Sequence, residues 1–160
     1  MRIAIQDAAE RYQDSVFRAA FFLCKNRQDA EDICQETFLA YYSSDMDFDS
    51  EEHIRAWLLR TAMNKAKNIL RQFWRRNSEP LSEFYEIADE EPAEYEELLE
   101  AVLSLPSRCR AVIHLYYYED CSIKDIARIL GIQENTVKSQ LHRGRTLLKE
   151  KLQENWNDEE

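Results

Sequence analysis

Glycine and proline are scarce in this chain, and their scarcity limits the folds that are open to it. The 160 residues include only two glycines, Gly131 and Gly144, and three prolines. A β-sandwich or β-barrel of this size needs turns rich in these residues about every 8–12 positions. Apolar residues instead recur at helical spacing through nearly the whole sequence. We therefore predict an all-α fold.

The periodicity predicts seven helices, three before residue 77 and four after residue 93. Their expected ranges are 7–25, 27–44, 53–76, 94–104, 107–118, 122–130 and 134–152. Ser50 has the position of an N-cap for the third. The expected apolar stripe of the first helix is Ala9, Tyr12, Val16, Ala20 and Leu23, and that of the second is Ala30, Ile33, Cys34, Thr37, Phe38 and Tyr41.

The formal net charge of −10, which by itself argues against a nucleic-acid partner, comes from a single stretch. Residues 77–100 contain ten acidic side chains and no basic one, whereas the segments before and after it are neutral. Two of the three prolines, Pro80 and Pro92, lie in the same stretch, which reads as a linker. We predict two small helical domains, 1–76 and 94–160, joined by an acidic linker at 77–93.

Each predicted domain contains a basic helix. Residues 53–76 hold seven Lys and Arg without an acid, and residues 122–152 hold seven against three acids. Such helices are either solvated surfaces or sites of contact with a phosphate backbone, and two of them in one acidic chain favour nucleic acid.

The segment 122–152 has the pattern of a helix-turn-helix. Ala127, Gly131 and Val137 supply a small residue at the helix crossing, a glycine at the turn and an aliphatic residue under the second helix. Gly144 also falls on the inner side. The outward face consists of hydroxyl, amide and cationic residues: Thr136, Lys138, Ser139, Gln140, His142, Arg143 and Arg145. These side chains suit phosphates and guanine edges in a major groove.

The basic helix of the first domain mixes cations, amides and aromatic residues, a combination that suits unstacked bases. Trp57 is expected in the core, whereas Phe73 and Trp74 either stack on bases or pack beneath the linker. The four cysteines lack metal-ligand spacing and read as small buried thiols in a reducing cytoplasm. No apolar run long enough for a membrane span occurs, and the start lacks the pattern of a secretory signal.

Three segments in this order resemble the sigma-70 family, and more narrowly its extracytoplasmic-function (ECF) sigma factors. They are DAEDICQETFLAYY (29–42), IRAWLLRTAMNKAKNILR (54–71) and the stretch 105–152 around SIKDIARILGIQENTVKSQLHRGR. The resemblance implies a protein without catalysis or cofactor that binds RNA polymerase core and promoter DNA. It implies that the first domain binds the β′ clamp helices and reads the −10 element, while the second reads the −35 element and binds the β flap. A partner anti-sigma factor is implied as well.

The resemblance also implies roles for individual residues. The residues that match the polymerase-facing surface are Asp29, Asp32, Gln35 and Glu36, and those that match the −10 segment are Asn64, Lys65, Lys67, Asn68 and Arg71. Those that match the −35 helix are Lys138, Ser139, His142 and Arg143, with Thr136 and Arg145 on phosphates. Cys109 and Asn68 depart from the residues frequent in the family, and Gln140 and His142 fall at variable base-reading positions.

Two other functions remain open from the residues. A helix-turn-helix repressor acting alone would need a dimer interface, for which no apolar stripe beyond the core is visible. A helical metal-dependent hydrolase could use Asp29, Asp32, Glu36 and His53 as ligands, although one histidine is few.

Overall fold

The computed structural model describes residues 1–76 and 93–158, and in 73–76, 93–96 and 154–158 it describes the backbone alone. The predicted linker, 77–93, lies outside the described residues except for its last position. The described residues are helical and contain no strand, as predicted. The chain divides into two compact units.

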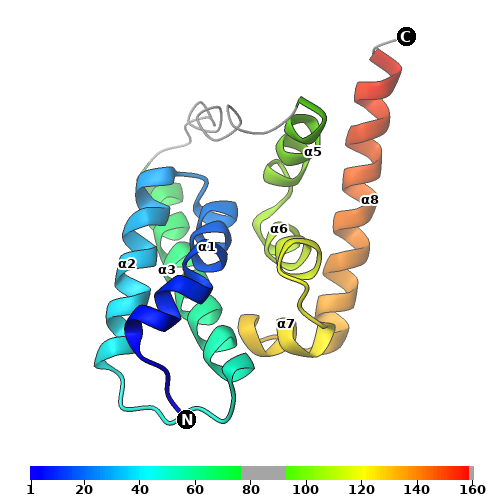
Figure 1. Cartoon of the computed structure of the whole chain (residues 1–160). Helices are drawn as coiled ribbons and strands as arrows, with labels where there is room; N and C mark the ends of the chain where they lie inside the picture. The colour runs from blue at the N-terminus through cyan, green and yellow to red at the C-terminus, as the bar shows by residue number, and fades with distance from the viewer. Residues whose placement is uncertain (77–92, 159–160) are drawn as a thin grey trace. The chain divides into compact units, whose positions relative to one another are not determined.

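The first unit is a bundle of α1 (Ile5–Cys24), α2 (Arg27–Ser43) and α3 (Glu51–Arg76), each of which packs against the other two (Figure 1). The apolar face predicted for α2 is confirmed, since all six of its residues are buried. In α1 the buried face differs from the predicted stripe. Val16, Ala20 and Leu23 are buried as predicted, whereas Ala9 and Tyr12 are only half-buried. The other buried residues are Ala8, Ala19, Phe21 and Phe22, because α1 is covered by two helices rather than one.

The junctions between these helices are fixed by local hydrogen bonds. Lys25 ends α1 in the left-handed conformation, with φ 59°, and the Asn26 side chain accepts from the Asp29 N–H at 2.8 Å to begin α2. Ser50 Oγ accepts from the His53 N–H at 3.1 Å, which confirms the predicted N-cap of α3.

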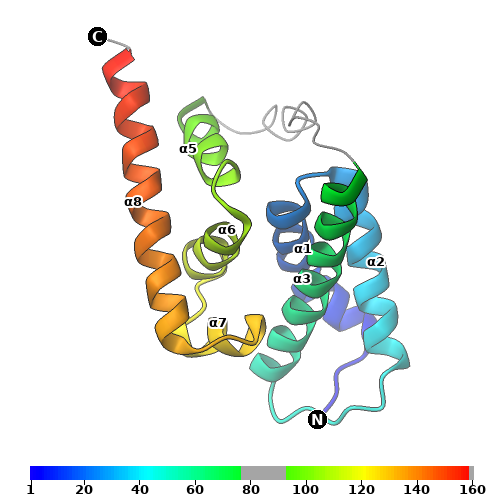
Figure 2. The ribbon, with the colours of Figure 1, turned by 180° about the vertical axis from the view of Figure 1, so that it is seen from behind.

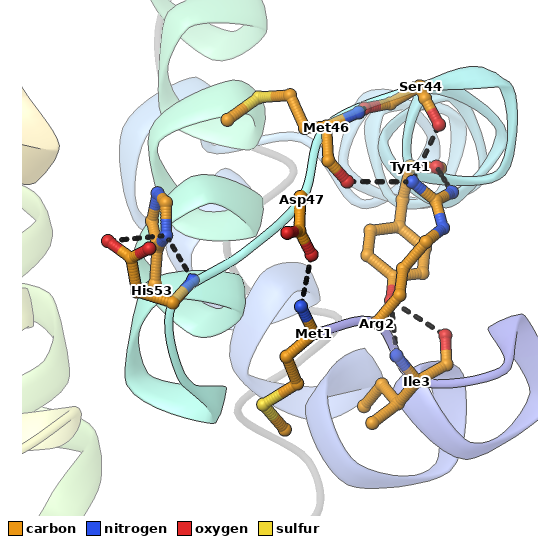
Figure 3. A network of polar contacts seen from close by, with 9 residues as sticks. Met1, Arg2, Ile3, Tyr41, Ser44, Met46, Asp47 and His53 are labelled. Carbon is orange, nitrogen blue, oxygen red and sulfur yellow. Dashed lines mark hydrogen bonds and ion pairs between the residues drawn. The ribbon is translucent and has the colours of Figure 1, made fainter.

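A network of polar contacts joins the N-terminal residues to the end of α2 and the loop that follows it (Figure 3). Arg2 donates to the carbonyl oxygens of Ser44, at 2.6 Å, and Met46, at 3.2 Å, and also to that of Tyr41. These bonds satisfy carbonyl groups at and just after the end of α2, where no further helical turn accepts them. The α-amino group of Met1 pairs with Asp47 of the same loop. The loop between α2 and α3 is therefore tied to the N-terminus over about 40 residues of sequence.

An aromatic cluster fills the space under this loop. The Phe48 ring lies 5.7 Å from that of Tyr41 and 5.9 Å from that of Trp57, measured between ring centroids. Tyr41 and Phe48 are fully buried, and Trp57 is half-buried beside them. Trp57 is thus part of the packed interior, and its edge-to-face contacts with Tyr41 and Phe48 add to the burial of apolar area.

The second unit contains α5 (Ala93–Leu103), α6 (Ser107–Ile113), η2 (His114–Tyr118) and α8 (Glu134–Asp158), while α7 (Ile123–Leu130) lies between η2 and α8 in sequence. α8 runs alongside α5 and α6, as Figure 2 shows. Arg110 of α6 is buried and donates to the carbonyl oxygens of Leu103 and Leu105 at 3.3 and 2.8 Å. It thereby satisfies carbonyl groups at the end of α5.

One element of this unit differs from the prediction. The expected single helix over 107–118 is an α-helix only as far as Ile113, and His114–Tyr118 forms a π-helix. The Glu119 N–H donates to the His114 carbonyl oxygen, five residues back, at 3.2 Å. The last helix also continues to Asp158, beyond the predicted residue 152.

Candidate nucleic-acid and polymerase interfaces

The helix-turn-helix forms as its sequence pattern predicts. Ser122 Oγ accepts from the Asp125 N–H at 3.1 Å at the start of α7, and Gly131 makes the turn with φ 67°. At the end of α7, the Ile132 N–H donates to the Ala127 carbonyl oxygen at 3.1 Å. In α8, Val137 and Leu141 are buried, so the opposite face of this helix is turned outward.

All six residues predicted for the −35 site lie on α8 with exposed side chains: Thr136, Lys138, Ser139, His142, Arg143 and Arg145. Ser139 Oγ donates to the Asn135 carbonyl oxygen at 3.0 Å. Arg145 Nε donates to the Tyr117 hydroxyl oxygen at 2.6 Å, and this bond raises the pKa of the guanidinium above its ordinary value. Arg145 is therefore held in place by a residue outside the helix-turn-helix.

The inner side of α8 is seated closely on α6. A Cβ atom at Gly144 would stand 2.8 Å from Ile113 Cγ1, so the glycine permits the approach of the two helices, as predicted. Cys109 Sγ donates to Gln140 Oε1 at 3.2 Å. Burial raises the pKa of the Cys109 thiol, with Arg143 acting in the opposite sense. Gln140, an expected variable base-reading position, is thus half-buried and bonded to α6.

The residues predicted for the −10 site lie along α3. Asn64, Asn68 and Arg71 are exposed at helical spacing, with Lys67 half-buried in the same row. Lys65 lies beside this row, and its Nζ is 3.4 Å from Glu36 Oε2 of α2. The side chains of Phe73 and Trp74, which offered a stacking platform, are outside the described residues.

The predicted polymerase-facing residues line the outer side of α2. Asp32, Gln35 and Glu36 are exposed, and Asp29 is half-buried at the helix start. Gln28 Nε2 donates to Asp32 Oδ1 at 3.3 Å. The pair between Glu36 and Lys65 brings this acidic side of α2 into contact with the basic side of α3.

Two apolar residues of α2 were missing from the predicted surface. Leu39 is 62% exposed and Tyr42 68% exposed. They follow Asp32, Gln35 and Glu36 at helical spacing, so the outer face of α2 is acidic at one end and apolar at the other. The signal was available in the sequence, since neither residue belongs to the stripe that α2 buries.

The metal-dependent hydrolase would need a cluster of metal-ligating side chains. Within residues 1–76 and 93–158, His, Cys, Asp and Glu do not gather in a group of three that could hold a metal ion. The four cysteines are free thiols, three of them buried and Cys24 half-buried. A helix long and apolar enough to span a membrane is not found among the described residues.

These features define a class. Two helical units, one with a helix-turn-helix and each with exposed cations along a helix, characterise a DNA-binding protein.

Family comparisons make the assignment specific. Residues 8–76 match the model for sigma-70 region 2, and residues 95–148 match that for sigma-70 region 4. The chain is 32% identical over 156 residues to the ECF RNA polymerase sigma factor SigE of Mycolicibacterium smegmatis, covering 91% of this chain and 60% of that relative. It is also 32% identical over 162 residues to the ECF RNA polymerase sigma-E factor of Haemophilus influenzae, covering 89% of this chain and 84% of that one. The chain belongs to the ECF group of sigma-70 family sigma factors.

Solved structures share the fold. The sigma factor RpoE of Bartonella quintana, in a complex with the anti-sigma factor NepR, aligns with a TM-score of 0.75 at 22% identity. The alignment covers 92% of this chain and 96% of that one. At this identity the likeness concerns the fold.

Proposed function

We propose that this chain binds the core of bacterial RNA polymerase and directs it to promoters by reading −10 and −35 elements. The observation that carries the proposal is the match to sigma-70 regions 2 and 4 in chain order, each over a unit with exposed cations on one helix. A repressor acting alone would not need a region 2, so this match disfavours that alternative.

The division of labour follows the two units. The domain at 1–76 binds polymerase and the −10 element, 77–93 is an acidic linker, and the domain at 94–160 binds the −35 element. On α8, Lys138, Ser139, His142 and Arg143 read bases, while Thr136 and Arg145 contact phosphates. On α3, Asn64, Lys65, Lys67, Asn68 and Arg71 contact the −10 element as a single strand.

The outer face of α2 binds the polymerase. Three acidic residues, Asp29, Asp32 and Glu36, together with the amide Gln35, suit a basic partner surface, which we take to be the β′ clamp helices. The exposed Leu39 and Tyr42 extend this interface with apolar area, because exposed apolar residues that adjoin a charged face are typical of a protein contact. The second domain contacts the β flap.

The remaining parts of the proposal concern its cellular setting. The chain acts in the cytoplasm and performs no chemical step of its own, since the polymerase catalyses RNA synthesis. An anti-sigma factor is its regulatory partner, by analogy with the NepR complex of the sigma factor from B. quintana.

Run-off transcription on genomic fragments with purified core polymerase tests the proposal. Discrete transcripts that appear only when the chain is added, together with retention of core polymerase on the immobilised chain, are the expected result. Absence of both would refute the sigma-factor function. A palindromic footprint without polymerase would point to the repressor instead.

A further inference from the structure

A π-helical turn in the second unit sets the direction of three consecutive tyrosines. η2 spans His114–Tyr118, and the hydrogen bond from the Glu119 N–H to the His114 carbonyl oxygen closes it. A π turn holds one residue more than an α turn, so the side chains that follow are rotated relative to a continued α-helix. His114 and Leu115 remain buried, while Tyr117 and Tyr118 are exposed. Such turns occur frequently at functional sites.

A buried pair of side chains spans this turn. His114 Nε2 lies 3.3 Å from Glu119 Oε1, and both side chains are shielded from solvent. The same two residues are joined through their backbones. Asp120 then takes the left-handed conformation, with φ 54°. His114 and Glu119 are thus in contact through both their side chains and their backbones, so the tyrosines between them are held in one orientation.

The orientation brings Tyr116 and Tyr117 against Arg145 of α8. The guanidinium carbon of Arg145 is 5.5 Å from the centroid of the Tyr116 ring and 5.6 Å from that of Tyr117. The two rings meet edge to face, with centroids 5.0 Å apart. Arg145 Nε donates to the Tyr117 hydroxyl oxygen at 2.6 Å. One arginine is thus stacked and hydrogen-bonded at the protein surface, where Tyr117 is 51% exposed.

The chemistry of this arrangement suits a phosphate group. The Tyr117 oxygen accepts from Arg145, which leaves the phenolic proton to be donated elsewhere. Arg145 donates its Nε–H to Tyr117, and its two terminal nitrogens, beside which Tyr116 also lies, carry the further N–H groups of the guanidinium. A guanidinium that is already oriented loses less rotamer freedom when it binds an anion than a free arginine does.

The location on α8 indicates which phosphate is bound. Arg145 lies one and two turns after His142 and Lys138 on the outward face, beyond the residues proposed to read bases. In a helix-turn-helix the first residues of the recognition helix contact base edges. Contacts further along suit the backbone and fix the register of the protein on the duplex.

We infer that Tyr117 and Arg145 together bind one backbone phosphate at the border of the −35 duplex, with Tyr117 both positioning Arg145 and donating its own hydroxyl. This rests on the proposed function, because the ligand is promoter DNA. It adds a DNA-contacting residue that lies outside the helix-turn-helix, on η2.

Neutral phosphate substitutions test this pair. The run-off assay first supplies a promoter fragment. Versions of this fragment are made in which a single neutral methylphosphonate replaces one phosphate of the −35 region at a time. The affinity of holoenzyme, assembled with the full chain, is then measured for each version. We expect one position at which neutralisation weakens wild-type binding by about tenfold, the usual effect of losing a hydrogen bond to a charged group. In Tyr117→Phe and Arg145→Ala holoenzymes the same substitution should weaken binding less than it does in the wild type, because each variant has already lost one of the two contacts.

Tyr118→Phe is the matched control, since it removes a phenolic oxygen one residue away, from a ring that stacks on His114. Tyr117→Phe is expected to weaken binding by about three- to tenfold and Tyr118→Phe by less than twofold. The double variant Tyr117→Phe/Arg145→Ala should lose less affinity than the sum of the two single losses, because the two residues act on one phosphate.

Two results would overturn the inference while leaving the proposed function intact. One is that Tyr117→Phe holoenzyme binds the promoter as tightly as wild-type holoenzyme and still initiates there. The other is a methylphosphonate pattern unchanged by Tyr117→Phe. Failure of the wild-type holoenzyme to bind any promoter fragment would instead refute the proposed function.

Discussion

Lys65 of α3 lies 3.4 Å from Glu36 of α2, so a residue proposed to contact the −10 element is paired with one proposed to contact the polymerase. The side chain of Lys65 is 34% exposed and that of Glu36 60% exposed. Water screens such a pair, which limits its contribution to the free energy of unfolding to less than about 1 kcal/mol. We therefore expect the pair to affect binding more than it affects the free energy of unfolding.

Lys65→Ala should separate these roles. We expect a free energy of unfolding within about 1 kcal/mol of the wild type in urea denaturation, because the pair is partly exposed. Core binding should persist, since Glu36 keeps its charge. Promoter opening, followed by permanganate reactivity of unpaired thymines in the −10 element, should fall. A parallel loss of core binding and opening would assign Lys65 to the polymerase surface instead.

Arg143→Ala tests base reading by α8. A bidentate contact with guanine contributes about 1–3 kcal/mol of discrimination, so the variant should lose that much affinity for its own promoter and less for a fragment with an altered −35 element. The measurement is competition binding with holoenzyme. Lys149→Ala is the control, because Lys149 is exposed on a later turn of the same helix. Equal losses on unrelated sequences would make Arg143 a phosphate contact.

The parts of this molecule that were predictable from sequence are those that depend on local periodicity. The buried stripe of α2 repeats at helical spacing, and Gly131 marks a turn that needs a left-handed residue. The exposed residues of α8 followed directly, because identifying Val137 as buried determines the opposite face.

Features that depend on distant contacts were not predictable in this way. The π turn at His114–Tyr118 is tied to a buried pair with Glu119, and the sequence gives no sign that this glutamate turns inward. Arg2 reaches carbonyl groups about 40 residues away, which no helical spacing indicates. The contact between Arg145 and Tyr117 joins residues 28 positions apart for the same reason.

Tyr41→Phe should destabilise the first unit. The buried Tyr41 hydroxyl donates to the Ile3 carbonyl oxygen at 2.7 Å and accepts from the Ile3 N–H at 3.1 Å. Loss of the hydroxyl leaves both backbone groups without this partner, at a cost of about 1–3 kcal/mol. Tyr42→Phe, the same change at a residue that is 68% exposed, should stay within about 0.5 kcal/mol. Urea denaturation compares them, and equal effects would contradict the role of the Tyr41 hydroxyl.

Stability should decline at alkaline pH because of two thiols. Burial raises the pKa of Cys34, with Asp14 adding to the effect, and burial also raises that of Cys109, from an ordinary value of 9.0. The folded state therefore favours the protonated thiols, and the stability they contribute is present below the ordinary pKa and lost as pH rises through the raised one. Urea midpoints measured from about pH 7 to pH 10 should fall, and less steeply in the Cys34→Ala/Cys109→Ala variant. An equally steep fall in that variant would exclude the thiols as the cause.

Gly144→Ala tests whether α8 depends on close approach to α6. In an exposed helix the substitution would stabilise by about 1 kcal/mol. Here the new Cβ would stand 2.8 Å from Cγ1 and 3.1 Å from Cδ1 of the buried Ile113, and Cγ1 lies too near the backbone to swing aside. Overpacking of this kind costs about 1–3 kcal/mol, so the variant should be less stable than the wild type by up to about 2 kcal/mol. Adding Ile113→Val, which removes Cδ1, should make the combined loss smaller than the sum of the single losses. A Gly144→Ala variant more stable than the wild type would show that α8 has room to move away from α6.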